Sequence, residues 1–187
     1  MSWINSHQNR TTFLRLLSPN PNEKILDVGA GKGTVAALVQ RSGKSKVYVL
    51  DPNKKRIAFV KERHPELESC LSGSEAMPYP DSFFDKVYST MAVHHFPDQR
   101  KSFREFARVV KPEGPLVIAE IAPYTFLGKL VRLFENGILR SRLRFLGAGE
   151  LTEMLRQNGD FEIKETRQNS SVYFVQAARA KAAPLAV

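Results

Sequence analysis

The sequence predicts one α/β domain whose sheet is doubly wound and mostly parallel. Apolar runs of strand length alternate with amphipathic helical stretches along most of the 187 residues, which is the order typical of α/β folds. A glycine-rich turn joins the first such strand to its helix, and the acid Asp51 ends the second strand. No repeat or linker divides the chain, so the domain is predicted to span residues 1–187.

Composition limits the class of protein. A hydrophobic fraction of 42% and a charged fraction of 25% are those of a soluble globular protein. No apolar run approaches the roughly 18 to 20 residues that span a bilayer. The N-terminus has no signal-peptide pattern, so a cytoplasmic protein is expected. Cys70 is the only cysteine, which excludes an intrachain disulfide and a cysteine-rich metal site.

The net charge of +9 is the unusual feature of the composition. Basic proteins attract phosphates on nucleic acids, anionic lipids or small molecules. A solvated surface rich in lysine and arginine is the alternative interpretation of the same charge.

Residues 25–39 are the most informative stretch, because they combine a strand, a turn with Gly29, Gly31 and Gly33, and a helix start. Such a turn lets a ligand approach the backbone closely. A phosphate-binding loop would need a glycine at Leu26, and a dinucleotide fingerprint would need one at Thr34. The spacing therefore disfavours both, although a dinucleotide enzyme and a ligand-free turn remain alternatives at this point.

Asp51 follows a predicted buried strand over residues 47–50, about 20 residues beyond the glycine turn. An acid in this place can accept hydrogen bonds from both hydroxyls of a ribose. Capping of the next helix is the alternative role for Asp51.

The pattern Asp-x-Gly-x-Gly-x-Gly over residues 27–33 resembles motif I of the class I S-adenosylmethionine-dependent methyltransferases. Residues 72–85 resemble the adenine-proximal loop of the type 11 branch, which includes the quinone-biosynthesis methyltransferases. The resemblance covers about residues 23–177, taken as the domain core. It implies a Rossmann-like seven-stranded sheet of order 3-2-1-4-5-7-6, with an antiparallel last strand and helices on both faces.

The resemblance also implies S-adenosylmethionine as cofactor, S-adenosylhomocysteine as product, and a set of contacts. The methionyl part would lie on Asp27, Gly29, Ala30, Gly31 and Gly33, the ribose on Asp51, the adenine faces on Pro52 and Met91, and the adenine edge on Ser74 and Glu75. The family's usual adenine-binding aspartate is replaced by Gly73. Adenine must then be held by backbone groups, a serine hydroxyl or stacking.

His94 and His95 follow a predicted fourth strand over residues 84–90. Ligands of open parallel sheets bind at the carboxyl ends of strands, which places this pair near the reacting centre. His95 is the candidate for a catalytic base or substrate contact. A structural imidazole is the main alternative, and no set of residues with ligand spacing supports a metal site.

The other predicted elements frame the site. A helix over 9–17 either crosses the pocket mouth or covers the sheet, and further elements are expected at 97–110 (helix), 116–121 (strand), 147–158 (helix), 161–165 (strand) and 171–177 (strand). Residues 124–146 are predicted to form a helical lid that is basic and amphipathic, and residues 178–187 a frayed tail. The lid could cover an acceptor, touch a membrane surface peripherally, or simply complete the core.

Together these features predict an S-adenosylmethionine-dependent methyltransferase acting on a small-molecule or lipid-like acceptor. An RNA methyltransferase is the first alternative, favoured by charge but lacking a recognisable RNA-binding module. A non-catalytic or NAD-dependent nucleotide-binding protein is the second.

Overall fold

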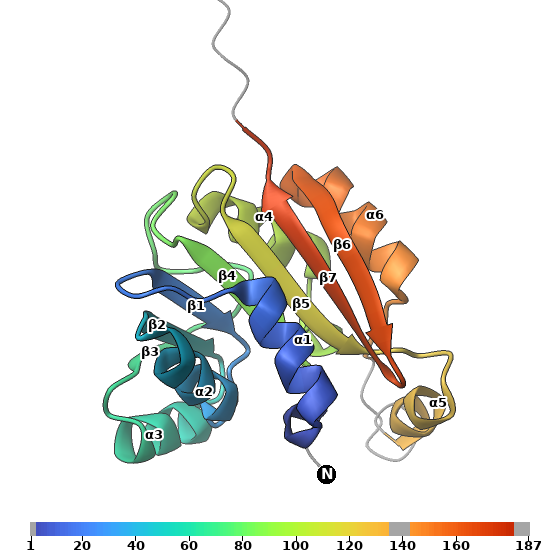
Figure 1. Ribbon diagram of the computed structural model, residues 1–187, viewed down its shortest axis with the longest axis horizontal. Coiled ribbons are helices and arrows are strands. Elements are labelled where there is room, and N and C mark those ends of the chain that lie inside the picture. The colour runs from blue at the N-terminus through green and yellow to red at the C-terminus, as the bar shows by residue number, and fades with distance from the viewer. Residues whose placement is uncertain (1–2, 135–142, 182–187) are drawn as a thin grey trace, which may run out of the picture.

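A seven-stranded sheet forms the centre of the molecule (Figure 1). The computed structural model describes residues 3–134 and 143–181. The strand order is β3-β2-β1-β4-β5-β7-β6, which confirms the predicted order. The strands are β1 (Lys24–Val28), β2 (Lys46–Asp51), β3 (Glu68–Leu71), β4 (Lys86–Thr90), β5 (Pro115–Ile121), β6 (Phe161–Asn169) and β7 (Val172–Arg179).

Strand direction explains where a site can form. β1 to β5 run parallel to one another, whereas β7 runs antiparallel to both β5 and β6. The carboxyl ends of the five parallel strands therefore lie along one edge of the sheet. The glycine turn, Asp51 and the histidine pair all follow strands that end at this edge.

Helices cover both faces of the sheet, as the sequence predicts (Figure 1). They are α1 (His7–Leu17), α2 (Thr34–Gly43), α3 (Lys54–Arg63), α4 (Gln99–Val109), α5 (Phe126–Leu133) and α6 (Ala148–Gly159), with short helical turns η1 (Trp3–Asn5) and η2 (Val93–His95). Among these described helices, none is long and apolar enough to cross a bilayer.

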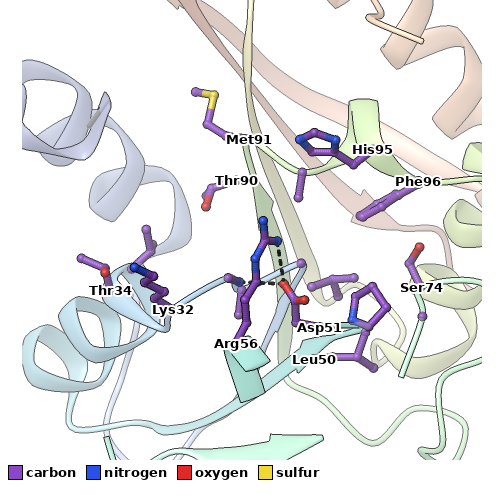
Figure 2. Close-up of a pocket in the computed structure, with 18 of the residues that line it drawn as sticks. Lys32, Thr34, Leu50, Asp51, Arg56, Ser74, Thr90, Met91, His95 and Phe96 are labelled. Carbon is purple, nitrogen blue, oxygen red and sulfur yellow. Dashed lines mark hydrogen bonds and ion pairs between the residues drawn. The ribbon is translucent and has the colours of Figure 1, made fainter. Parts of the chain in front are cut away.

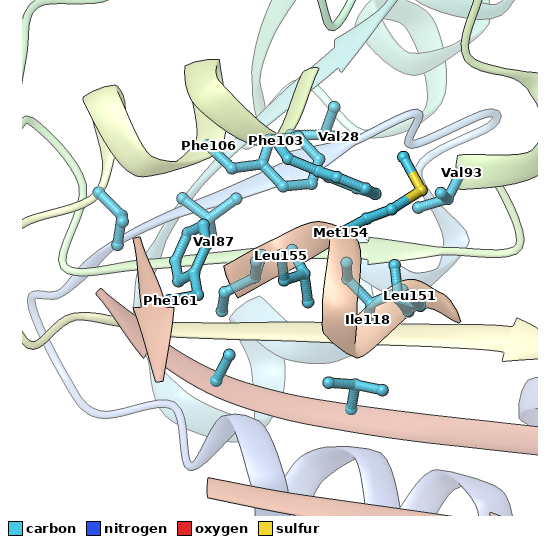
Figure 3. Packing of buried hydrophobic residues seen from close by; sticks show 14 of the residues in the cluster. Val28, Val87, Val93, Phe103, Phe106, Ile118, Leu151, Met154, Leu155 and Phe161 are labelled. Carbon is cyan, nitrogen blue, oxygen red and sulfur yellow. The ribbon is translucent and has the colours of Figure 1, made fainter. Parts of the chain in front are cut away.

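One face is packed by α4 and α6 (Figure 3). Phe103 and Phe106 recur at helical spacing on α4, and they meet Leu151 and Leu155 of α6 over the sheet. All four side chains are completely buried. Each such burial contributes about 1.5–3 kcal/mol, so this cluster holds β4, and the loop after it, firmly in place.

The other face is packed by α1, α2 and α3. Phe13 and Leu17 of α1 are fully buried, and Gln176 of β7 donates a 2.8 Å hydrogen bond to the Leu16 carbonyl. α1 thus covers the sheet, which was one of the two predicted roles. The preceding turn η1 brings Trp3 to the cavity described below.

Some predicted boundaries differ from the structure. Strand β7 runs to Arg179, because Ala178 pairs with Pro115 and Arg179 with Phe161, so the predicted tail begins two residues too early. α5 forms within the predicted lid. Residues 135–142 of that lid and residues 182–187 of the tail lie outside the described residues.

Candidate active site

A cavity of about 440 Å³ opens at the carboxyl edge of the parallel strands (Figure 2). Its walls come from the glycine turn, the end of β2, the loop after β3 and the loop after β4. The predicted site residues that line it are Gly29, Ala30, Gly31, Asp51, Pro52, Ser74, Glu75, Met91 and His95. Asp27 and Gly33, also predicted, lie outside the lining.

The glycine turn needs glycine for two different reasons. Gly29 has φ of 77°, and a Cβ there would lie 2.5 Å from the Ala92 Cβ. Gly31 has φ of 58°, and a Cβ there would meet no protein atom within 4 Å. Gly31 lines the cavity, so its missing side chain leaves room for a ligand. Gly33 instead faces Val60 of α3, which explains why it does not line the cavity.

Asp51 is buried at the tip of β2 and organises the turn. One carboxylate oxygen accepts a 2.9 Å hydrogen bond from the Gly31 amide, and the other accepts one of 2.9 Å from the Asn53 amide. The Arg56 guanidinium lies 3.4 Å from the first oxygen, as Figure 2 shows. Asn53, rather than Asp51, caps α3 with its side chain.

Asp27 lies beneath the turn, at 1% exposure. Neither carboxyl oxygen has a hydrogen-bond partner of good geometry among the described residues. Burial raises the pKa of Asp27 to about 8, while the neighbouring Tyr88 hydroxyl lowers it and Asp51 raises it further. A cation placed near this carboxyl group would favour its ionised form.

The loop after β3 shows what occupies the space at residue 73, where the resemblance implies an aspartate. A Cβ at Gly73 would lie 2.8 Å from a carboxylate oxygen of Glu75, so the Glu75 side chain fills this space. The Ser102 hydroxyl donates to the Asp98 carbonyl, and hence the Ser74 hydroxyl donates its own proton to Ser102, at 2.8 Å. Ser74 therefore has only acceptor capacity left.

The histidine pair divides between two environments. His95 is exposed and lines the cavity. His94 is 7% exposed, and its Nδ1 lies 2.8 Å from a carboxylate oxygen of Glu120 at the end of β5. In the described part of the chain, no group of three or more His, Cys, Asp or Glu residues is arranged to hold a metal ion.

Sequence reasoning missed several residues of this region, among them Trp3, Arg56 and Glu120. Trp3 and Arg56 line the cavity, and Glu120 pairs with His94. Arg56 lies five residues after Asp51, in the first turn of the helix that Asn53 caps. This spacing is only a weak signal for an ion pair between the two side chains. Nothing local to the sequence links residue 120 to residue 94, because their contact depends on the parallel pairing of β4 and β5.

A family profile described as a methyltransferase domain matches residues 26–118. The demethylmenaquinone methyltransferase of Thermotoga maritima is 29% identical over 170 residues, which cover 79% of this chain and 73% of that protein. A probable S-adenosylmethionine-dependent methyltransferase of Mycobacterium tuberculosis is 28% identical over 162 residues, covering 86% of this chain and 56% of that protein.

The fold agrees with these matches. The crystal structure of an S-adenosylmethionine-dependent methyltransferase from Mesorhizobium loti superposes with a TM-score of 0.80 at 18% identity, covering 94% of this chain and all of that one (100%). The fold and site define a nucleoside-binding Rossmann-like domain. The matches make the assignment specific, and together they support a class I S-adenosylmethionine-dependent methyltransferase.

Proposed function

We propose that this chain transfers the methyl group of S-adenosylmethionine to a small-molecule or lipid-like acceptor. The observation that carries the proposal is the cavity in which the cleared space at Gly31 lies beside the buried carboxylate of Asp51. Neither the RNA-directed nor the NAD-dependent alternative finds support in the relatives described above.

The residues present fit the cofactor. The space at Gly31 and the unpaired carboxyl group of Asp27 suit a cationic methionyl part, and Asp51 suits the ribose hydroxyls. Pro52 and Met91 would contact the two faces of adenine. Glu75 would accept from its amino group, since the carboxylate already occupies the space at Gly73. The Ser74 hydroxyl would offer at most an acceptor.

The protein's contribution to the reaction is mainly placement. When bound, the cofactor supplies a methyl group already activated on a positively charged sulfur. The protein then has to hold the acceptor in line with the methyl group and exclude water, which is how proximity lowers the barrier. A base is needed only where the acceptor must lose a proton.

Helix α5 supports an apolar acceptor. Its exposed side chains include Phe126 at 85%, Leu133 at 66% and Leu130 at 52% exposure, and Tyr124 just before the helix is 55% exposed. The helix sequence carries Lys129 and Arg132 and no acidic residue. An exposed apolar helix whose sequence includes cations and no acid suits the surface of an anionic membrane, from which a lipid-like acceptor would enter.

Methyl transfer is tested with labelled S-adenosylmethionine and extracts of small metabolites, lipids and RNA, with the products identified by mass spectrometry. Label in a small or lipid-like product supports the proposal. Label in RNA alone, or a folded protein that transfers none, would contradict it.

A further inference from the structure

A second cavity, of about 220 Å³, lies beside the first and shares His95, Phe96 and Pro97 with it. Its other walls come from His94, the start of α4, residues 143–144 and Met154 of α6. The loop that follows β4 therefore lines both cavities. None of the cofactor contacts proposed above requires this space.

His94 lines the second cavity and is held by a carboxylate. Glu120 uses one oxygen to accept from the Val93 amide at 2.8 Å and the other to contact His94 Nδ1 at 2.8 Å. An ionised carboxylate only accepts hydrogen bonds, so Nδ1 carries a proton, and in the neutral imidazole Nε2 keeps its lone pair. No described residue forms a hydrogen bond with His94 Nε2.

The imidazole ring of His94 is also fixed in orientation. Phe145 stacks on it with a centroid distance of 4.5 Å and an interplanar angle of 14°. The His95 ring lies 4.2 Å away. A ring with one nitrogen bound to a carboxylate and its plane packed by an aromatic neighbour has the features of an oriented general base.

The rim of the second cavity is basic. Arg100 and Arg144 contribute two cations, against Asp98 as the one acid among the described lining residues. Gln99 donates to the Val93 carbonyl at 3.0 Å and to the Arg144 carbonyl at 2.8 Å. These two bonds tie the backbone at Arg144 to the loop that carries His94.

We propose that the second cavity binds the acceptor and that His94 is its general base, with Glu120 as a positioning residue. This rests on the proposed function. The acceptor would carry an acidic O–H group toward His94 and an anionic substituent toward Arg100 and Arg144. As the O–H bond breaks, its proton moves to His94 Nε2, the oxygen bonds to the methyl carbon, and the C–S bond electrons remain on sulfur.

The first test is a binding measurement that needs no turnover. The probe is meta-hydroxybenzoate, which joins an acidic hydroxyl to a carboxylate, and its neutral amide is the control ligand. Long-range proton–nitrogen NMR of labelled histidine should show the probe shifting the His94 Nε2 signal. Arg144→Ala should weaken binding by about tenfold, the loss expected for a charge-assisted contact. Arg104→Ala, on the exposed side of α4 outside both cavities, should not.

The second test distinguishes a general-base role of His94 from a purely structural role. Transfer of labelled methyl to the probe should fall about 100-fold in His94→Gln, while cofactor affinity stays unchanged. Glu120→Gln should lower the fraction of the Nδ1–H tautomer seen by NMR. The inference is overturned if the probe leaves His94 unshifted, if the amide binds equally well, or if His94→Gln retains full transfer. A chain that fails to bind S-adenosylmethionine at all refutes the proposed function instead.

Discussion

Asp51 serves both the protein backbone and the proposed ribose contact. Because its carboxylate accepts from the Gly31 and Asn53 amides, the side chain is already oriented before a ligand arrives. Asp51→Ala should weaken S-adenosylmethionine binding by at least about tenfold, or ~1.4 kcal/mol, as measured by calorimetry. Asp81→Ala removes an exposed acid and is the matched control. Unchanged affinity in a folded Asp51→Ala protein would refute the ribose role.

Buried Asp27 is expected to lower the free energy of unfolding while it favours binding of the cofactor. Its folded pKa of about 8 lies above the unfolded value of 3.8, so the folded chain retains a proton that the unfolded chain releases between these values. Stability therefore falls as pH rises through this window. Asp27→Asn should raise the free energy of unfolding by at least about 1 kcal/mol at neutral pH, with a gain that grows from pH 4 to pH 8.

The same substitution should weaken cofactor binding, because an amide cannot pair with a cation as a carboxylate does. Chemical denaturation across pH, with parallel binding titrations, measures both effects. Equal stability of the two proteins at all pH values would show that Asp27 is not perturbed as described.

The glycine turn should respond differently at its two critical positions. Gly29→Ala forces a Cβ to within 2.5 Å of Ala92 and should destabilise the fold by more than about 1 kcal/mol. Gly31→Ala meets no protein atom, so beyond a smaller strain its effect should fall on cofactor affinity. Melting temperatures and binding titrations of both variants distinguish the cases. A Gly31→Ala protein with full affinity would show that the cavity at Gly31 is not used.

Helix α5 is predicted to bind anionic membranes. The protein should float with vesicles that contain anionic lipid and not with neutral ones, since each cation near the surface contributes about 1 kcal/mol. Phe126→Ser with Leu130→Ser should reduce partitioning by at least about tenfold through lost apolar contact. Leu71→Ser on β3, exposed to 51%, is the control. Flotation that the double substitution leaves unchanged would exclude α5 as the contact.

Much of the chain's architecture could be predicted, because alternating strands and helices restrict the topology. The positions of Gly29, Gly31 and Asp51 relative to strand ends were enough to place them in one cavity. The contacts of Arg56 with Asp51, and of Glu120 with His94, depend on side-chain conformation and on pairing between distant strands. Local sequence carries only a weak signal for the contact of Arg56 with Asp51 and none for that of Glu120 with His94.

Gly33 shows a further limit of prediction from the sequence. Its place in the motif suggests a ligand contact, whereas the helix α3, which comes later in the chain, packs against it. The missing aspartate at Gly73 could be recognised from the sequence. The use of the same space by Glu75 became visible only in three dimensions.

At the scale of the whole molecule, the central claim is that the main cavity binds S-adenosylmethionine. Trp3 is the only tryptophan and lines the main cavity, so its fluorescence should report cofactor binding. Calorimetric titration with S-adenosylmethionine, with Trp3 fluorescence alongside and NAD as the competing ligand, is therefore the most direct test. We predict saturable binding of one S-adenosylmethionine per chain that NAD does not displace. A folded protein that ignores S-adenosylmethionine, or binds NAD in its place, would contradict the cofactor site described here.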